Sequence, residues 1–111
     1  LGRSEVTVMK VIADICIVPI GVGVSLSSYI AACGDILNRA GLHCHLHAYG
    51  TNVEGEWGLV MDSLRECHEK VHSMGAPRIS TTIKLGTRSD RDQTMRDKVE
   101  SVRGCLRGTS T

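Results

Sequence analysis

The sequence predicts an α+β domain: a four-stranded antiparallel sheet with two helices on one face and an additional C-terminal helix. Three observations support this prediction. The chain has 111 residues, which is the size of one domain. Apolar and polar residues alternate in segments 42–49 and 78–87, which is the period of a strand. Between the predicted strands, apolar residues recur every three or four positions, which is the period of a helix.

The first half of the chain predicts a strand, a helix and a hairpin. Residues 6–18 are β-branched and almost continuously apolar, which is typical of a central strand with both faces at least partly covered. The next elements are a helix at 26–40 with Ser25 as its N-cap, a strand at 42–49, a turn or bulge at 50–52 and a short strand at 52–56.

The second half predicts a helix, a strand and a last helix. The helix begins near Trp57, and Gly75 and Pro77 end it. Its predicted buried stripe consists of Trp57, Val60, Met61, Leu64, Cys67 or His68, Val71 and Met74. After strand 78–87, Ser89 is the predicted N-cap of the last helix, with Asp92 three residues later as a weak capping box.

The order of these elements defines the predicted topology. Two β-α-β units joined by a hairpin form the ferredoxin-like βαββαβ sandwich. Right-handed crossovers then place both main helices on the same face of the sheet. We expect a single domain at residues 6–107, with flexible ends at residues 1–5 and 108–111.

The other face of the predicted sheet is left without helices, and its residues are mostly polar. Strand parity assigns to it Lys10, Asp14, Cys16, His43, His45, His47, Arg78, Ser80, Thr82 and Lys84, interrupted by Ile12 and Val18. We refer to it as the open face. Its composition is typical of a surface that meets a ligand or a partner.

Composition excludes several functional classes. Thirteen Lys and Arg balance 12 Asp and Glu, so the chain lacks the basic excess of a nucleic-acid-binding protein. No apolar run is long enough to span a membrane.

Five scattered cysteines without a C-x-x-C pair fit a reducing, cytoplasmic compartment, and Cys33, Cys67 and Cys105 fall where small buried residues are expected. With Trp57, Tyr29 and Tyr49 as the only aromatics, the core is thin, which favours a homo-oligomer.

Three histidines form the first candidate site. His43, His45 and His47 alternate on one strand, so their imidazoles share a face. Such a row can hold a metal if Asp14 or Cys16 supplies a further ligand, which would allow a metal-dependent enzyme. The alternative is that the histidines form hydrogen bonds at a polar interface.

Two further segments carry candidate residues. In residues 51–57, Glu56 is expected to cap the following helix, whereas Glu54 is free to pair with a cationic ligand. In residues 85–93, Arg88 can hold an anion or pair with Asp90 or Asp92. No nucleophile is paired with a base, so we expect no catalytic residue, no metal and no resident cofactor.

Three motifs together carry a family resemblance: ADICIVPIG at 13–21, GTNVEGEW at 50–57 and LGTRSDRDQTMRDKV from residue 85. In this order and spacing they resemble the small thiamine-binding-protein family, with archaeal, bacterial and fungal members. The resemblance covers residues 9–106. It implies a ferredoxin-like subunit, dimers that join their sheets and pair into tetramers, and, in some members, binding of thiamine or its hydroxymethylpyrimidine part.

Together the resemblance and the open face predict a non-catalytic protein that binds a small ligand between subunits. The candidate ligand-binding residues are His47, Thr51, Asn52, Glu54, Thr82 and Arg88. Glu54 would offset the thiazolium charge or accept from the pyrimidine amino group, and Thr51, Asn52 and Thr82 would offer neutral hydrogen bonds. The remaining alternatives are a structural protein without a small ligand and the metal-dependent enzyme.

Overall fold

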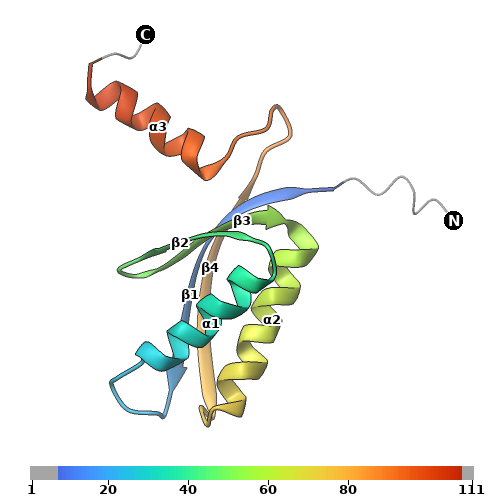
Figure 1. Cartoon of the computed structure of the whole chain (residues 1–111), viewed down its shortest axis with the longest axis vertical. Helices are drawn as coiled ribbons and strands as arrows, with labels where there is room; N and C mark the ends of the chain where they lie inside the picture. The colour runs from blue at the N-terminus through green and yellow to red at the C-terminus, as the bar shows by residue number, and fades with distance from the viewer. Residues whose placement is uncertain (1–7, 109–111) are drawn as a thin grey trace, which may run out of the picture.

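The structure is a computed structural model that describes residues 8–108. Its elements are β1 (Lys10–Ile20), α1 (Ser27–Arg39), β2 (His43–His47), β3 (Gly50–Glu56), α2 (Trp57–Ser73), β4 (Arg78–Thr87) and α3 (Met95–Leu106) (Figure 1). No helix within this range has the length and apolar character needed to cross a membrane. The expectation of flexible ends at 1–5 and 108–111 falls, except for Gly108, outside the described residues.

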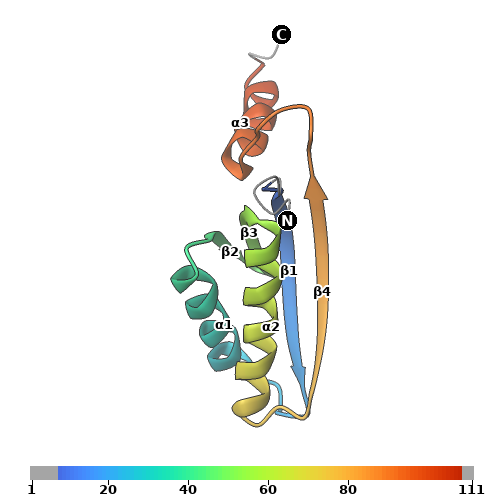
Figure 2. The same cartoon turned by 90° about the vertical axis from the view of Figure 1, so that its right-hand side faces the viewer.

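The four strands form one antiparallel sheet in the order β2-β3-β1-β4. This order is the one that two β-α-β units joined by a hairpin produce, so the predicted ferredoxin-like α+β fold is confirmed. Viewed from the side, α1 and α2 lie together on one side of β1 and β4 (Figure 2). The β2–β3 hairpin lies between these two helices and α3 (Figure 1).

The core lies between the sheet and helices α1 and α2, and it is aliphatic, as the absence of Phe requires. Alternate residues of β1 point into it, and every second residue from Val11 to Pro19 is buried. The largest fully buried side chains are Leu37, Val11, Val53, Val60, Val71 and Cys67. Because the buried residues of β1 face the helices, the residues that alternate with them along the strand face the open side of the sheet.

Two strand boundaries differ from the sequence prediction. β1 begins at Lys10 and runs through Pro19 to Ile20. Pairing of β1 with β3 extends only to Ile15, and beyond it β1 pairs with β4 alone, so a residue without an N–H is tolerated there. β3 begins at Gly50, within the segment predicted as a turn.

Helix starts also differ from the prediction. The N-cap of α1 is Leu26, without a side-chain hydrogen bond, and not Ser25. The N-cap of α3 is Thr94 and not Ser89, and its capping partner is Asp97. Both contacts of a capping box are present: Asp97 N–H donates to Thr94 Oγ1 at 3.0 Å, and Thr94 N–H donates to Asp97 Oδ2 at 3.1 Å. A capping box this strong fixes where α3 begins.

Two residues predicted to be buried are exposed. Trp57 begins α2 at the end of the sheet and is 41% exposed, so its prediction as core was wrong. Cys105 is also exposed, as part of a helix, α3, in which no residue is buried. Cys33 and Cys67 are buried as predicted, and the neighbouring Cys33 thiol together with burial raises the pKa of the Cys67 thiol. Cys67 is therefore protonated and unreactive at neutral pH.

Candidate functional site

The open face is polar and carries the residues that strand parity assigned to it. Asp14 of β1 lies between Asn52 of β3 and Lys84 of β4 in the register of the sheet. His45 of β2 continues the same row beyond Asn52. Directly opposed residues on neighbouring strands lie about 5 Å apart at Cβ, so these side chains form one continuous polar surface.

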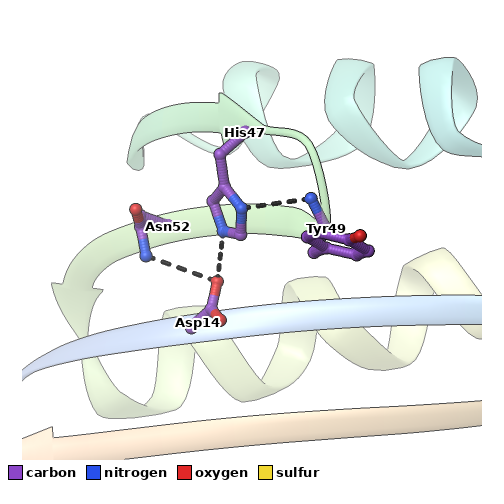
Figure 3. A network of polar contacts seen from close by, with 4 residues as sticks. All are labelled: Asp14, His47, Tyr49 and Asn52. Atoms are coloured by element: carbon purple, nitrogen blue, oxygen red, sulfur yellow. Dashed lines mark hydrogen bonds and ion pairs between the residues drawn. The ribbon is translucent and has the colours of Figure 1, made fainter.

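A hydrogen-bonded network occupies the middle of this surface (Figure 3). The imidazole Nε2 of His47 lies 2.6 Å from Asp14 Oδ1, and Asn52 Nδ2 donates to the same oxygen at 3.3 Å. The three residues come from β2, β1 and β3. The network thus joins three strands and fixes the Asp14 carboxylate in one orientation.

The second ring nitrogen of His47 defines its tautomer. The backbone N–H of Tyr49 donates to His47 Nδ1 at 3.3 Å, so Nδ1 is the acceptor nitrogen. The proton of the neutral ring is then on Nε2, where it is donated to Asp14. His47 therefore acts as a neutral donor that positions the Asp14 carboxylate.

A cavity of about 380 Å³ opens beside this network, and we call it the Asp14 cavity. Asp14 and Asn52 line it together with Lys84 and Gly86 of β4, residues 91–93 and Lys98 of α3. Its volume is within the range of small-molecule sites, roughly 300–1,000 Å³. An ideal Cβ built on Gly86 meets nothing within 4 Å, so the wall is open there.

The Asp14 cavity offers both donors and acceptors for hydrogen bonds. Among residues 8–108, both bonds to the Asp14 carboxylate are made by Oδ1, which leaves Oδ2 as an acceptor. Asn52 uses one amide hydrogen on Asp14 and keeps its second hydrogen and its carbonyl oxygen. This pair of side chains can recognise a planar group that carries an amino group beside a ring nitrogen.

Glu54 lies on the open face beneath α3. Its side chain is only 7% exposed, and Oε2 accepts a hydrogen bond from the backbone N–H of Met95 at 3.2 Å. Met95 is the first residue of α3, so the carboxylate also lies at the positive end of the helix dipole. This contact holds α3 on the hairpin and uses one oxygen of the carboxylate that the sequence suggested for a cation.

Replacing Glu54 with Ala is expected to loosen α3 selectively. The substitution removes the acceptor of the Met95 N–H, and α3 has no buried side chain to compensate. Loss of a hydrogen bond to a charged group costs about 1.5–3 kcal/mol, so amide protection in residues 95–106 should fall about tenfold or more. Hydrogen–deuterium exchange measures this. Glu66→Ala on the exposed surface of α2 is the control, and equal exchange in both variants would contradict the role of Glu54.

The remaining predicted site residues are not all brought together. Thr51 pairs with the buried Ile15 and therefore lies on the helix-covered side of β3, away from the open face. Thr82 is on the open face opposite Cys16, but it is not among the residues that line the Asp14 cavity. Arg88 also lines the cavity, but its guanidinium forms an ion pair with Asp90.

The Arg88 contacts are bidentate. Nε and Nη2 donate to the two carboxylate oxygens of Asp90 at 2.6 and 2.9 Å, and Nη1 donates to Gln93 at 2.8 Å. The guanidinium lowers the pKa of the Asp90 carboxyl. Of the two alternatives that the sequence left open, the surface pair with Asp90 is therefore the one formed.

The histidine row lies on the open face, as its alternation predicted. His43 pairs with Glu54 and His45 with Asn52, and both imidazoles are exposed, whereas His47 is bonded to Asp14. Residues 8–108 contain no group of three or more His, Cys, Asp or Glu side chains arranged to hold a metal ion. The geometry thus assigns His47 to hydrogen bonding.

Sequence reasoning placed Asp14 and Lys84 on the open face but did not select them as ligand-binding residues. Asp14 is an isolated carboxylate within an apolar strand, and that isolation was the available signal, since a charge in such a position needs a partner. Glu56 behaves as expected: its carboxylate caps α2 by accepting from the N–H groups of Gly58 and Leu59.

Comparisons with known proteins agree with the fold. A family model described as thiamine-binding protein matches residues 13–103. A UPF0045 protein of Synechocystis sp. is 51% identical over 110 residues, which cover 92% of this chain and 91% of the relative. A UPF0045 protein of Eremothecium gossypii is 38% identical over 95 residues, which cover 85% of this chain and 90% of the relative.

Solved structures show the same architecture. A hypothetical protein of Methanocaldococcus jannaschii superposes with a TM-score of 0.80 at 26% identity, covering 85% of this chain and 96% of that one. A second solved structure is a Thermotoga maritima protein that is provisionally described as a thiamine biosynthesis or salvage protein. It gives a TM-score of 0.72 at 23% identity, and the match covers 85% of this chain and 99% of that one. At that identity the second likeness shows the fold alone.

Proposed function

We propose that this chain, which belongs to the thiamine-binding protein family, binds a small ligand at the open face. The proposed ligand is thiamine or its hydroxymethylpyrimidine part, which the protein would bind without transforming it. The binding site in this proposal is the Asp14 cavity on the open face. The family description supports a small-ligand-binding role, and the geometry of Asp14 and Asn52 supports the choice of ligand.

One observation carries the choice of ligand: a fixed carboxylate and an amide stand side by side at the wall of the cavity. The pyrimidine ring has an amino group next to a ring nitrogen. Asp14 Oδ2 would accept a hydrogen bond from the amino group, and the second amide hydrogen of Asn52 would reach the ring nitrogen. His47 would keep the carboxylate in place from behind. A bond from a neutral amine to a carboxylate is among the stronger kinds in proteins.

The chemistry of the residues supports binding without catalysis. His47 is held between Asp14 and the Tyr49 N–H, so both of its ring nitrogens are occupied. The Thr81 hydroxyl lies 2.7 Å from His68 Nε2, but both residues lie between β4 and α2, on the opposite face of the sheet from the cavity. A nucleophile would need to be in the cavity to meet the ligand.

Association of several copies is part of the proposal. Val18 and Ile20 are exposed apolar residues on the open face, and Val99, Val102 and Leu106 are exposed on α3. In a monomer these side chains would remain in water, and burying them between subunits is favourable. A homo-oligomer, with dimers that pair into tetramers, would place the site near a subunit interface. Five free cysteines agree with a reducing, cytoplasmic location.

Isothermal titration of the purified protein with thiamine and with hydroxymethylpyrimidine tests the proposal. We expect saturable binding of at least one of them, with light scattering on the same sample reporting a mass above that of one chain. Absence of heat and of a thermal shift at millimolar ligand would overturn ligand binding. An oligomer without ligand binding would instead favour a structural or interaction protein.

A further inference from the structure

The lining of the Asp14 cavity has more positively than negatively charged side chains. Its lining carries five cations and two carboxylates: Lys10, Lys84, Arg88, Arg91 and Lys98 against Asp14 and Asp92. Lys10 and Lys84 belong to β1 and β4, Arg88 and Arg91 to the segment between β4 and α3, and Lys98 to α3. This local excess contrasts with the net charge of +1 for the whole chain.

Internal ion pairs account for only part of these cations. Arg88 is taken by Asp90 and Gln93. Arg91 and Lys10 lie near Asp97, where their charges help the Thr94 N–H and hydroxyl to lower the pKa of the Asp97 carboxyl. Within residues 8–108, Lys84 and Lys98 have no carboxylate within ion-pair distance. The ammonium groups of Lys84 and Lys98 are therefore available to a ligand.

Their positions relate directly to the pyrimidine contacts. Lys84 is the cross-strand partner of Asp14, so its side chain starts from the neighbouring position on the same face. Lys98 belongs to α3 and lines the same cavity. A ligand whose ring reaches Asp14 would thus extend its substituent between two ammonium groups.

The thiazolium of free thiamine is a poor match for such a lining because it brings a further positive charge. A phosphate monoester matches it, since a dianion with three terminal oxygens can accept from both ammonium groups. We infer that the Asp14 cavity takes a phosphorylated pyrimidine, with its ring at Asp14 and its phosphate between Lys84 and Lys98. This inference rests on the proposed function and specifies the form of its ligand.

Titration with matched ligand pairs tests the inference. The pairs are hydroxymethylpyrimidine against its phosphate and thiamine against thiamine monophosphate, with inorganic phosphate as a separate ligand. We expect each ester to bind about tenfold more tightly than its unphosphorylated partner at low salt, since exposed charged contacts of this kind contribute on that scale. The preference should shrink as salt rises, because salt screens exposed charges.

Variants locate the phosphate contact. Lys84→Gln and Lys98→Gln should each reduce the ratio of ester to non-ester affinity severalfold, and the double variant should abolish the preference. Lys70→Gln on the exposed surface of α2 makes the same charge change away from the cavity and should leave every affinity unchanged. Circular dichroism confirms that each variant is folded.

The outcomes separate the two claims. If no pyrimidine binds in either form, the proposed function fails and the inference fails with it. If both forms bind equally, the proposed function stands and the inference is overturned. Inorganic phosphate that binds as tightly as the esters would also overturn it, because the cavity would then recognise an anion without the ring.

Discussion

Asp14→Asn is expected to weaken binding of the pyrimidine ligand about tenfold to a hundredfold while leaving the protein folded. The substitution keeps an oxygen that can accept from His47 and Asn52, so the network on the open face retains its shape. It removes the carboxylate charge that makes the bond to the ligand's amino group strong. A hydrogen bond to a charged group contributes about 1.5–3 kcal/mol, which corresponds to this range of affinity.

Calorimetric titration of wild type and variant with hydroxymethylpyrimidine measures the effect of Asp14→Asn. Asp62→Asn on the exposed surface of α2 removes the same charge away from the cavity and should bind as wild type does. Thermal unfolding of both variants controls for stability. Wild-type affinity in Asp14→Asn would show that the pyrimidine is not held by this carboxylate.

Gly50→Ala is expected to destabilise the fold by about 1–3 kcal/mol, the usual cost of forcing an extra carbon into a packed site. An ideal Cβ on Gly50 would lie 2.6 Å from the backbone carbonyl oxygen of Ile15 and 3.4 Å from His47 Cε1. The first atom belongs to the paired strand β1 and cannot rotate away. The start of β3 would have to move, and the His47 ring with it.

Urea unfolding of Gly50→Ala and Gly86→Ala provides a matched comparison within one sheet. An ideal Cβ on Gly86 has nothing within 4 Å, and its φ is not in the left-handed region, so Ala should be neutral or gain about 0.4–1 kcal/mol there. The difference between the two variants isolates the collision with Ile15. Equal free energies of unfolding would mean that the strands adjust without cost.

The fold followed from local patterns because each pattern has a direct geometric meaning. The strict alternation of His43 to His47 placed its histidines on one face, and the same parity placed Asp14 on that face. Helical spacing correctly identified Cys33 and Cys67 as buried. The same reasoning misplaced Trp57 and Cys105, because periodicity shows which face of a helix is apolar but does not show whether anything covers it.

The candidate site was less accessible to such reasoning because its contacts join residues distant in the chain. Asp14 meets His47 and Asn52 across 33 and 38 residues, and Glu54 meets Met95 across 41. Glu54 and Asp14 are both carboxylates on the open face, and the sequence around them does not show which of the two α3 covers. The helix that covers Glu54 leaves Asp14 beside an open cavity, and only that placement separates a structural carboxylate from one available to a ligand.

The sequence by itself determined the order of the elements, the face that each strand residue occupies and the polar character of the open face. These properties depend on the period of the strand or helix, which shows in the pattern of neighbouring residues along the chain. The tertiary structure alone decided where α3 lies, which carboxylate it covers and which lysines remain without a carboxylate partner beside Asp14. These outcomes depend on how the 88–94 segment returns across the sheet, and no periodic pattern encodes that path.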